Sequence, residues 1–159
     1  HYMSVDAGLV ATIVGIIMFL AGITSASSSL MVGKLTERFP MKRLLIVATV
    51  GVGATFVLQY AMWNIWGLGF FRGFTGVFMG LVMPIANTLI SQAVIPDKRG
   101  LVFGAVSSVV MMGNVAGPFF SGAFANAFGY GTVFWSTAIA FFLAAFVIKT
   151  QLPNKKTNN

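Results

Sequence analysis

Apolar residues gather in five long runs that short polar stretches separate. The runs cover residues 7–32, 44–62, 67–93, 101–128 and 133–148. As a helix the first run would be about 39 Å long at ~1.5 Å per residue, enough to cross a hydrocarbon core ~30 Å thick. Backbone groups inside a bilayer must bond within their own segment, so such a run is helical. The pattern predicts an all-α, multi-pass membrane protein with five transmembrane helices within residues 1–152 and a polar tail over residues 153–159.

The basic residues and the interfacial aromatic residues sort to opposite ends of these runs. Every Lys and Arg except Arg72 lies in residues 33–43, in residues 96–100 or after residue 148. The Tyr and Trp residues lie at the other ends: Tyr2, Tyr60, Trp63, Trp66, Tyr130 and Trp135. Because basic loops stay in the cytoplasm, we expect the chain to start outside the cell membrane and its tail to be cytoplasmic.

Arg72 lies inside the third run, where a charge is costly unless it meets polar groups. Small, polar or flexible residues share its face of a helix: Thr75, Gly76, Met79, Met83, Ala86, Asn87 and Ile90. The opposite face is bulky, and we expect it to contact lipid: Phe70, Phe71, Phe74, Phe78, Leu81, Ile85 and Leu89. Arg72 therefore either joins a polar interior or snorkels to the outer headgroups.

Small residues also form stripes that suit close helix packing. In the first run they dominate positions three and four apart: Gly8, Ala11, Gly15, Met18, Gly22, Ser25, Ser29 and Gly33. In the fourth run we expect Gly113, Gly117 and Ser121 to form a flat contact strip, and Pro118 to bend the helix. The hydroxyl residues between positions 24 and 29 either line a polar cavity or bond the carbonyl one turn back.

Composition narrows the class of protein further. Hydrophobic residues make up 57% of the chain and charged residues 8%, whereas soluble domains are ~25% charged. The net charge of +7 sits between apolar runs and orients them, so we expect no nucleic-acid partner. The chain has no Cys and its single His is residue 1, which argues against a metal site, a metalloenzyme and a cysteine enzyme. We expect the protein not to be an enzyme.

Four motifs occur in a fixed order. Gly33 precedes Glu37-Arg38 and Lys42-Arg43; then come an Arg72 to Gly76 motif, a second charged loop, and a Gly-x-x-x-Gly-Pro motif. The residues that carry these motifs are Gly33, Glu37, Arg38, Lys42, Arg43, Arg72, Gly76, Arg99, Gly100, Gly113, Gly117 and Pro118. Together they resemble the major facilitator superfamily of secondary transporters, and the last resembles its drug and proton antiporters. Glu37 and Pro40 depart from the usual Asp and Gly of the loop motif.

The resemblance implies a twelve-helix fold built from two similar six-helix halves. Glu37, Pro40 and Asn114 favour the second half, spans eight to twelve, over spans two to six of the first. The chain begins with His and no signal-peptide pattern precedes the first run, so we expect a piece of a longer protein. Its expected partners are the lipid bilayer and the other half of the transporter, in a bacterial cytoplasmic membrane.

The implied function is efflux of small drug-like compounds by alternating access, driven by the proton gradient and without a cofactor. The residues expected along the substrate pathway are Arg72, Thr75, Met79, Met83, Asn87 and Asn114. No acidic residue lies within a run, so a proton-carrying residue is expected elsewhere in the protein. A sugar or metabolite carrier of the same superfamily, or a small membrane protein that does not transport, are the alternatives.

Overall fold

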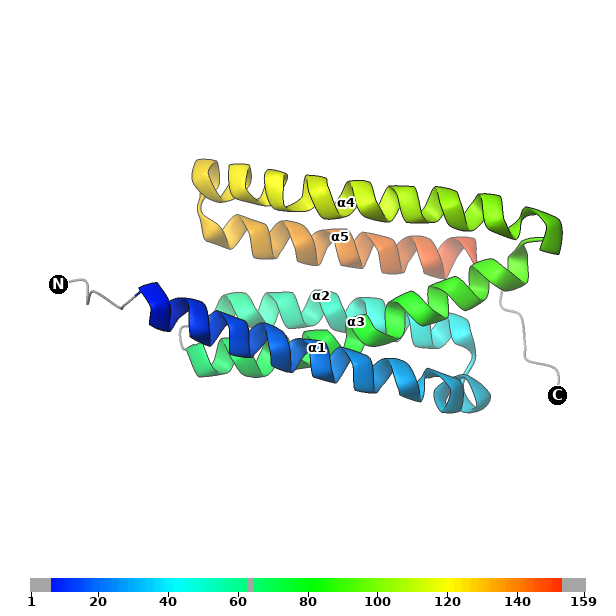
Figure 1. Cartoon of the computed structure of the whole chain (residues 1–159), viewed down its shortest axis with the longest axis horizontal. Helices are drawn as coiled ribbons and strands as arrows, with labels where there is room; N and C mark the ends of the chain where they lie inside the picture. Colours follow the sequence, from blue (N-terminus) through cyan, green and yellow to red (C-terminus); the bar gives the residue numbers. More distant parts are fainter. Residues whose placement is uncertain (1–6, 63–64, 153–159) are drawn as a thin grey trace.

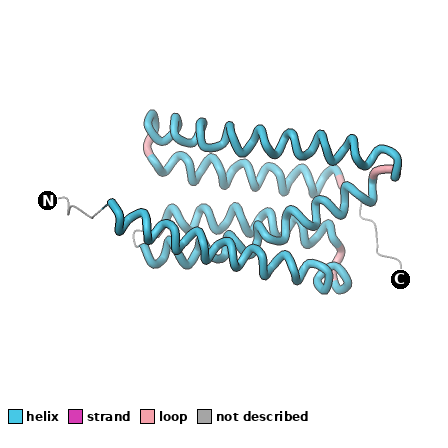
Figure 2. The backbone as a smooth tube through the Cα atoms, viewed as in Figure 1, coloured by secondary structure: helices cyan, strands magenta, loops and turns pink. Residues whose placement is uncertain are grey.

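The computed structural model of the chain describes residues 7–62 and 65–152. Its long helices are α1 (Ala7–Arg38), α2 (Met41–Ala61), α3 (Ile65–Ala93), α4 (Arg99–Phe128) and α5 (Tyr130–Gln151), with a short 3-10 helix η1 (Pro96–Lys98) before α4. Within these residues every regular element is helical (Figure 2). All five long helices are long and apolar enough to cross a membrane. The prediction of an all-α, multi-pass membrane protein is confirmed, and the predicted tail lies outside the described residues.

The helix bounds differ most from the sequence prediction in the charged stretch 33–43. That stretch is mainly helical, because α1 runs to Arg38 and α2 begins at Met41. Pro40 explains where the break falls, since a proline disfavours helical geometry in the residue before it. The charged side chains therefore sit on helix ends that extend beyond the apolar run, and the connection itself is short.

The helices lie side by side in an order that differs from their order in the chain (Figure 1). α3 packs between α1 and α2, α2 packs on α5, and α4 contacts mainly α5. α2 is therefore the central helix, α3 lies between it and α1, and α4 lies at the margin. No residue of α4 is buried.

The face of α3 that was expected to contact lipid instead packs largely against α2. Ile85 is fully buried in a core cluster with Val32 of α1 and Leu45 of α2. Partly buried side chains of the same α3 face pack against this cluster: Leu81 and Leu89. Phe70 and Phe74 are the exposed members of the bulky set. The prediction was wrong because a neighbouring helix is as apolar as lipid, so bulk alone does not distinguish the two surroundings.

α1 and α3 approach each other through glycines of α3. A Cβ atom added to Gly80 would overlap the backbone oxygen of Ser25, and one added to Gly76 would overlap that of Ala21. Thr24 Oγ1 lies 3.0 Å from the carbonyl oxygens of Ala21 and of Gly73, so its hydroxyl can donate across the interface. These contacts let the two backbones pack directly, as small residues do between membrane helices.

Within the described residues, only part of the predicted packing strip of α1 contacts another helix: Ser25 lies against Gly80 and Met18 against Arg72. An added Cβ would meet nothing within 4 Å at Gly15, Gly22 or Gly33 of α1, nor at Gly113 or Gly117 of α4. α1 packs on α3 through Ala21, Thr24 and Ser25, and only Ser25 of these belongs to the predicted strip. On α4 the two glycines of the expected strip, Gly113 and Gly117, do not meet another described helix.

Candidate functional site

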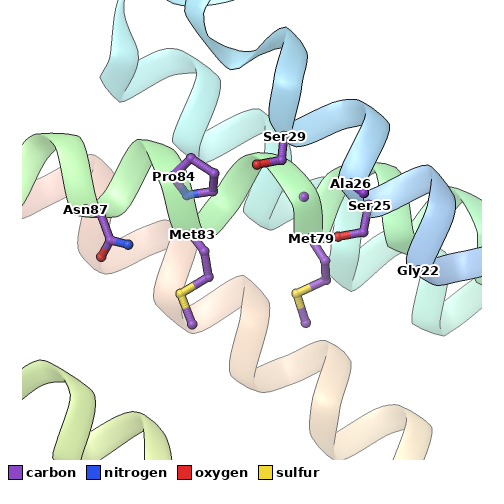
Figure 3. A pocket seen from close by; sticks show the side chains of 9 residues that line it. Gly22, Ser25, Ala26, Ser29, Met79, Met83, Pro84 and Asn87 are labelled. Atoms are coloured by element: carbon purple, nitrogen blue, oxygen red, sulfur yellow. The ribbon is translucent and has the colours of Figure 1, made fainter.

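A groove of about 580 Å³ runs along the junction of α1 and α3 (Figure 3). α1 contributes small and hydroxyl-bearing residues: Gly22, Ser25, Ala26 and Ser29. α3 contributes larger side chains on one face, together with a glycine and a proline: Met79, Gly80, Met83, Pro84 and Asn87. Met79, Met83 and Asn87 project from α3 toward the same side (Figure 3). The groove lies well inside both membrane-spanning helices.

Helix periodicity places these residues together. Residues spaced by three and four positions share one face of a helix, and the lining residues of both helices have this spacing. Pro84 adds a polar feature, because it lacks the N–H that would bond the carbonyl of Gly80 one turn earlier. α3 continues through Pro84 all the same. The groove is therefore lined by hydroxyls, an amide, thioethers and a backbone carbonyl without its usual helical donor.

The chemistry of the lining suits the binding of a small molecule. None of the lining residues carries a charge. The Met79 and Met83 side chains are flexible and polarisable, so they can adapt to differently shaped apolar groups. Ser25, Ser29 and Asn87 can form hydrogen bonds with a polar end of the same molecule. The arrangement can hold a small amphipathic compound.

A second recess of about 340 Å³ lies between the same two helices, nearer the start of each, and is almost entirely apolar. Its lining residues are Ile13, Ile16, Ile17, Leu20, Trp66, Gly69 and Phe70. On α1 these positions and those of the groove fall on opposite faces of the helix. The contrast identifies the groove as the polar side of the α1–α3 pair.

The structure separates the six predicted pathway residues into four places, of which that of Arg72 is described below. Met79, Met83 and Asn87 all line the groove. Thr75 is 5% exposed and lies between α2 and α3. Asn114 is exposed on α4 and does not line the groove. The hydroxyl cluster of α1 divides in the same way, because Ser25 and Ser29 line the groove while Thr24 bonds backbone carbonyls.

Thr75 belongs to a buried hydrogen-bonded network that sequence reasoning missed. Gln59 Nε2 donates to Thr75 Oγ1 at 2.7 Å, and Thr75 Oγ1 lies 3.0 Å from Thr55 Oγ1 and 3.0 Å from the carbonyl oxygen of Phe71. Gln59 is 2% exposed. The signal in the sequence was the spacing of four between Thr55 and Gln59, which places both on one face of an otherwise apolar helix.

Arg72 lies where α1, α2 and α3 meet. Its Cζ atom is 5.9 Å from the centroid of the Phe56 ring of α2. Its Nη2 atom is 3.9 Å from the Sδ atom of Met18 on α1. A guanidinium over an aromatic face is a favourable cation–π arrangement. The charge is thus met by a ring and a thioether among the described residues.

The loop-motif residues lie at the helix ends. Glu37 and Arg38 are exposed at the end of α1, and Arg99 and Gly100 are exposed at the start of α4. Lys42 Nζ donates to the backbone oxygen of Leu152, which ties the start of α2 to the end of α5. Arg99 Nε donates to the carbonyl oxygen of Val94 at 3.4 Å. These contacts place Lys42 at the start of α2 and Arg99 at the start of α4 close to backbone acceptors.

Comparison with known proteins gives a consistent family. The model of the Major Facilitator Superfamily matches residues 1–159. The chain is 34% identical over 143 residues to the multi-drug resistance efflux pump PmrA of Streptococcus pneumoniae, covering 90% of this chain and 36% of that protein. It is 33% identical over 141 residues to the multidrug resistance protein MdtG of Escherichia coli, covering 86% of this chain and 34% of that protein.

The chain thus spans about a third of the length of these curated relatives. The family match, in contrast, extends over all of its residues. The motif order, the five apolar helices and this match agree, and the chain belongs to the Major Facilitator Superfamily.

Proposed function

We propose that the protein containing this chain is a secondary active transporter that exports small drug-like compounds by alternating access. The groove between α1 and α3 is the observation that carries the proposal. Its volume of about 580 Å³ falls within the ~300–1,000 Å³ of typical small-molecule sites. Superfamily membership and the similarity to the multidrug resistance proteins PmrA and MdtG support the same function.

The position of the groove supports a transport role. Substrate sites of secondary transporters lie near the middle of the bilayer, and the lining segments Gly22 to Ser29 and Met79 to Asn87 lie away from the ends of α1 and α3. Flexible methionines beside hydroxyl and amide groups would accept varied apolar compounds that carry a polar end. This is the chemical character that a multidrug exporter requires.

The driving force in this proposal is the proton gradient across the bacterial cytoplasmic membrane. Among the described residues, the acidic side chains are Glu37 at the end of α1 and Asp97 in η1, both exposed. Neither lies in the interior of a membrane-spanning helix. The residue that binds and releases the proton therefore belongs to the rest of the protein, and this chain supplies part of the substrate path.

The remaining two thirds of the transporter would complete the site. We assign this chain to spans eight to twelve of a twelve-helix protein, with its tail in the cytoplasm. The exposed surface of α4 would then be covered by helices from outside this chain. The groove is open on one side, and we expect the other half of the transporter to close it. This chain, about a third of the protein, cannot enclose the groove alone.

Dye efflux from cells tests the proposal. The full-length protein is produced in bacteria that lack their own major efflux pumps, and loss of ethidium fluorescence is followed after the cells are loaded. We expect energy-dependent efflux that stops when an ionophore collapses the proton gradient. Efflux equal to that of cells without the protein would contradict export of this dye class, and uptake of a labelled sugar instead would favour the carrier alternative.

A matched pair of variants ties efflux to the groove. Met83 lines the groove and is 50% exposed, whereas Met31 of α1 is 55% exposed and does not line it. Met83→Ala should weaken efflux or change which dyes are exported, and Met31→Ala should not. Equal effects at matched protein levels would remove the groove from the substrate path.

A further inference from the structure

We propose that Phe56 and Gln59 of α2 are positioning residues for Arg72 and hold its guanidinium group at the junction of α1, α2 and α3. The inference rests on the proposed function only where it concerns efflux. Its structural part concerns contacts within the described helices. No sequence motif includes Phe56 or Gln59, so the assignment comes from geometry.

Arg72 of α3 lies against the Phe56 ring of α2. The guanidinium carbon lies 5.9 Å from the ring centroid, within the ~6 Å at which an arginine is attracted to an aromatic face. Inside a membrane this attraction is not weakened by bulk water.

Two aromatic rings of α5 fix the position of the Phe56 ring. The Phe141 ring stacks with the Phe56 ring at a centroid distance of 6.3 Å and an interplanar angle of 14°. The Phe134 ring lies 6.4 Å from Phe56 at 52°. Phe134 and Phe141 are two helical turns apart and share one face of α5. Phe56 is therefore fixed by one helix while it holds a charge on another.

A buried hydrogen bond sets the register of α2 against α3. Gln59 lies one turn from Phe56 on α2, and Thr75 lies one turn from Arg72 on α3, so this bond is close to the contact between Arg72 and Phe56. Gln59 Nε2 donates to Thr75 Oγ1 at 2.7 Å, and both residues are almost fully buried. Sliding α2 along α3 would break this bond and leave buried polar groups without partners. The bond thus keeps Phe56 beside Arg72.

Arg72, which is on α3, also contacts α1, so it links three helices. Its Nη2 atom contacts the Sδ atom of Met18 at 3.9 Å. A thioether is only a weak acceptor, so this contact adds little direction. The orientation of the guanidinium then depends mainly on the Phe56 ring, which makes Phe56 the residue to test.

A double-mutant cycle in the full-length transporter provides the test. Phe56→Leu removes the ring but keeps an apolar side chain, and we expect it to lower the maximal rate of ethidium efflux roughly two- to fivefold, the ratio that corresponds to a single cation–π contact. Phe56→Tyr keeps the aromatic ring, so this variant should export ethidium at about the wild-type rate. In an Arg72→Ala background Phe56→Leu should have no further effect. Phe74→Leu, which removes an exposed ring on α3, serves as the control and should leave efflux unchanged.

Thermal unfolding in detergent tests the contact without transport. The four proteins of the cycle are the wild type, Phe56→Leu, Arg72→Ala and the double variant. The effects of Phe56→Leu and Arg72→Ala on Tm should be non-additive, and Gln59→Leu should reduce that coupling. Additive effects on Tm, or a Phe56→Tyr protein as impaired as Phe56→Leu, would overturn the inference even if efflux is normal in the wild type. A wild type without efflux but with the expected coupling would instead refute the proposed function alone.

Discussion

α3 and α4 each carry two glycines four residues apart, yet the two pairs have different surroundings. On α3, Gly76 and Gly80 lie against the backbone of α1 so closely that no Cβ atom could be added without overlap. On α4, an added Cβ at Gly113 or Gly117 would meet nothing within 4 Å. α3 lies between two neighbours and α4 lies at the margin of the bundle (Figure 1). The spacing predicts the capacity for close contact and does not identify the partner.

Hydroxyl groups show the same difference. Thr75 of α3 joins a buried network with Gln59 and Thr55 of α2. On α4, Ser108 donates to Gly104 within its own helix at 2.9 Å, and Ser121 donates to Pro118 at 3.1 Å. Thr75 therefore connects two helices, whereas Ser108 and Ser121 bond only within α4. The surface of α4 is the one that we assign to contact with the rest of the transporter.

The largest effect is expected when a methyl group is added at the α1–α3 contact. Gly80→Ala places a Cβ on the backbone oxygen of Ser25, and a backbone cannot move aside as a side chain can. Overpacking of this kind costs about 2–3 kcal/mol or more. Thermal unfolding of the purified full-length protein should show a clearly lowered Tm, and membrane levels should fall.

The corresponding change on α4 is the control. In the 159-residue chain Gly117→Ala should change stability by less than about 0.5 kcal/mol, because no neighbour among the described residues lies within 4 Å of the added carbon. A cost for Gly117→Ala that appears only in the full-length protein would identify this strip as a contact with the missing portion. Equal costs at Gly80 and Gly117 in the short chain would contradict the described packing.

A smaller effect is expected from the hydroxyl groups. Thr75→Val keeps the shape of the side chain but leaves Gln59 Nε2 buried without its acceptor, which should cost about 1–2 kcal/mol. Ser108→Ala removes only a bond within α4 and should be nearly neutral. Urea or thermal unfolding of the two variants compares them directly. A neutral Thr75→Val would show that the network between α2 and α3 does not stabilise the protein.

The smallest effect concerns a glycine that faces a side chain. An added Cβ at Gly53 would lie 3.1 Å from the Cε1 atom of Phe142 and 3.4 Å from the backbone oxygen of Ala138. The ring edge can shift by a few tenths of an ångström, so Gly53→Ala should cost below about 1 kcal/mol. If its Tm fell as far as that of Gly80→Ala, the distinction between backbone and side-chain neighbours would fail.

The helices and three groove residues were predictable from the sequence for a physical reason. Long apolar runs must be helical in a bilayer, and a period of 3.6 places Met79, Met83 and Asn87 on one face. The partners of each face were not predictable. Ile85 was expected to contact lipid because a buried helix interface and lipid select the same apolar side chains.

Long-range pairing also determined what was missed. The hydrogen bond of Gln59 could not be predicted, because its partner Thr75 lies 16 residues away on another helix. The same holds for Phe56, which lies between rings of α5 and the charge on α3. Periodicity along one helix cannot report contacts of this kind, since they depend on how the helices are ordered in space.

The most direct test of the central claim is whether the groove between α1 and α3 carries substrate. The chain has no native Cys, so after cysteines elsewhere in the protein are replaced, Ser29→Cys places one thiol in the groove and Met31→Cys places one outside it. A membrane-permeant maleimide should abolish ethidium efflux in the first variant, and excess substrate should slow its reaction. The second variant should react without loss of efflux. Full efflux from a completely modified Ser29→Cys protein would contradict the account.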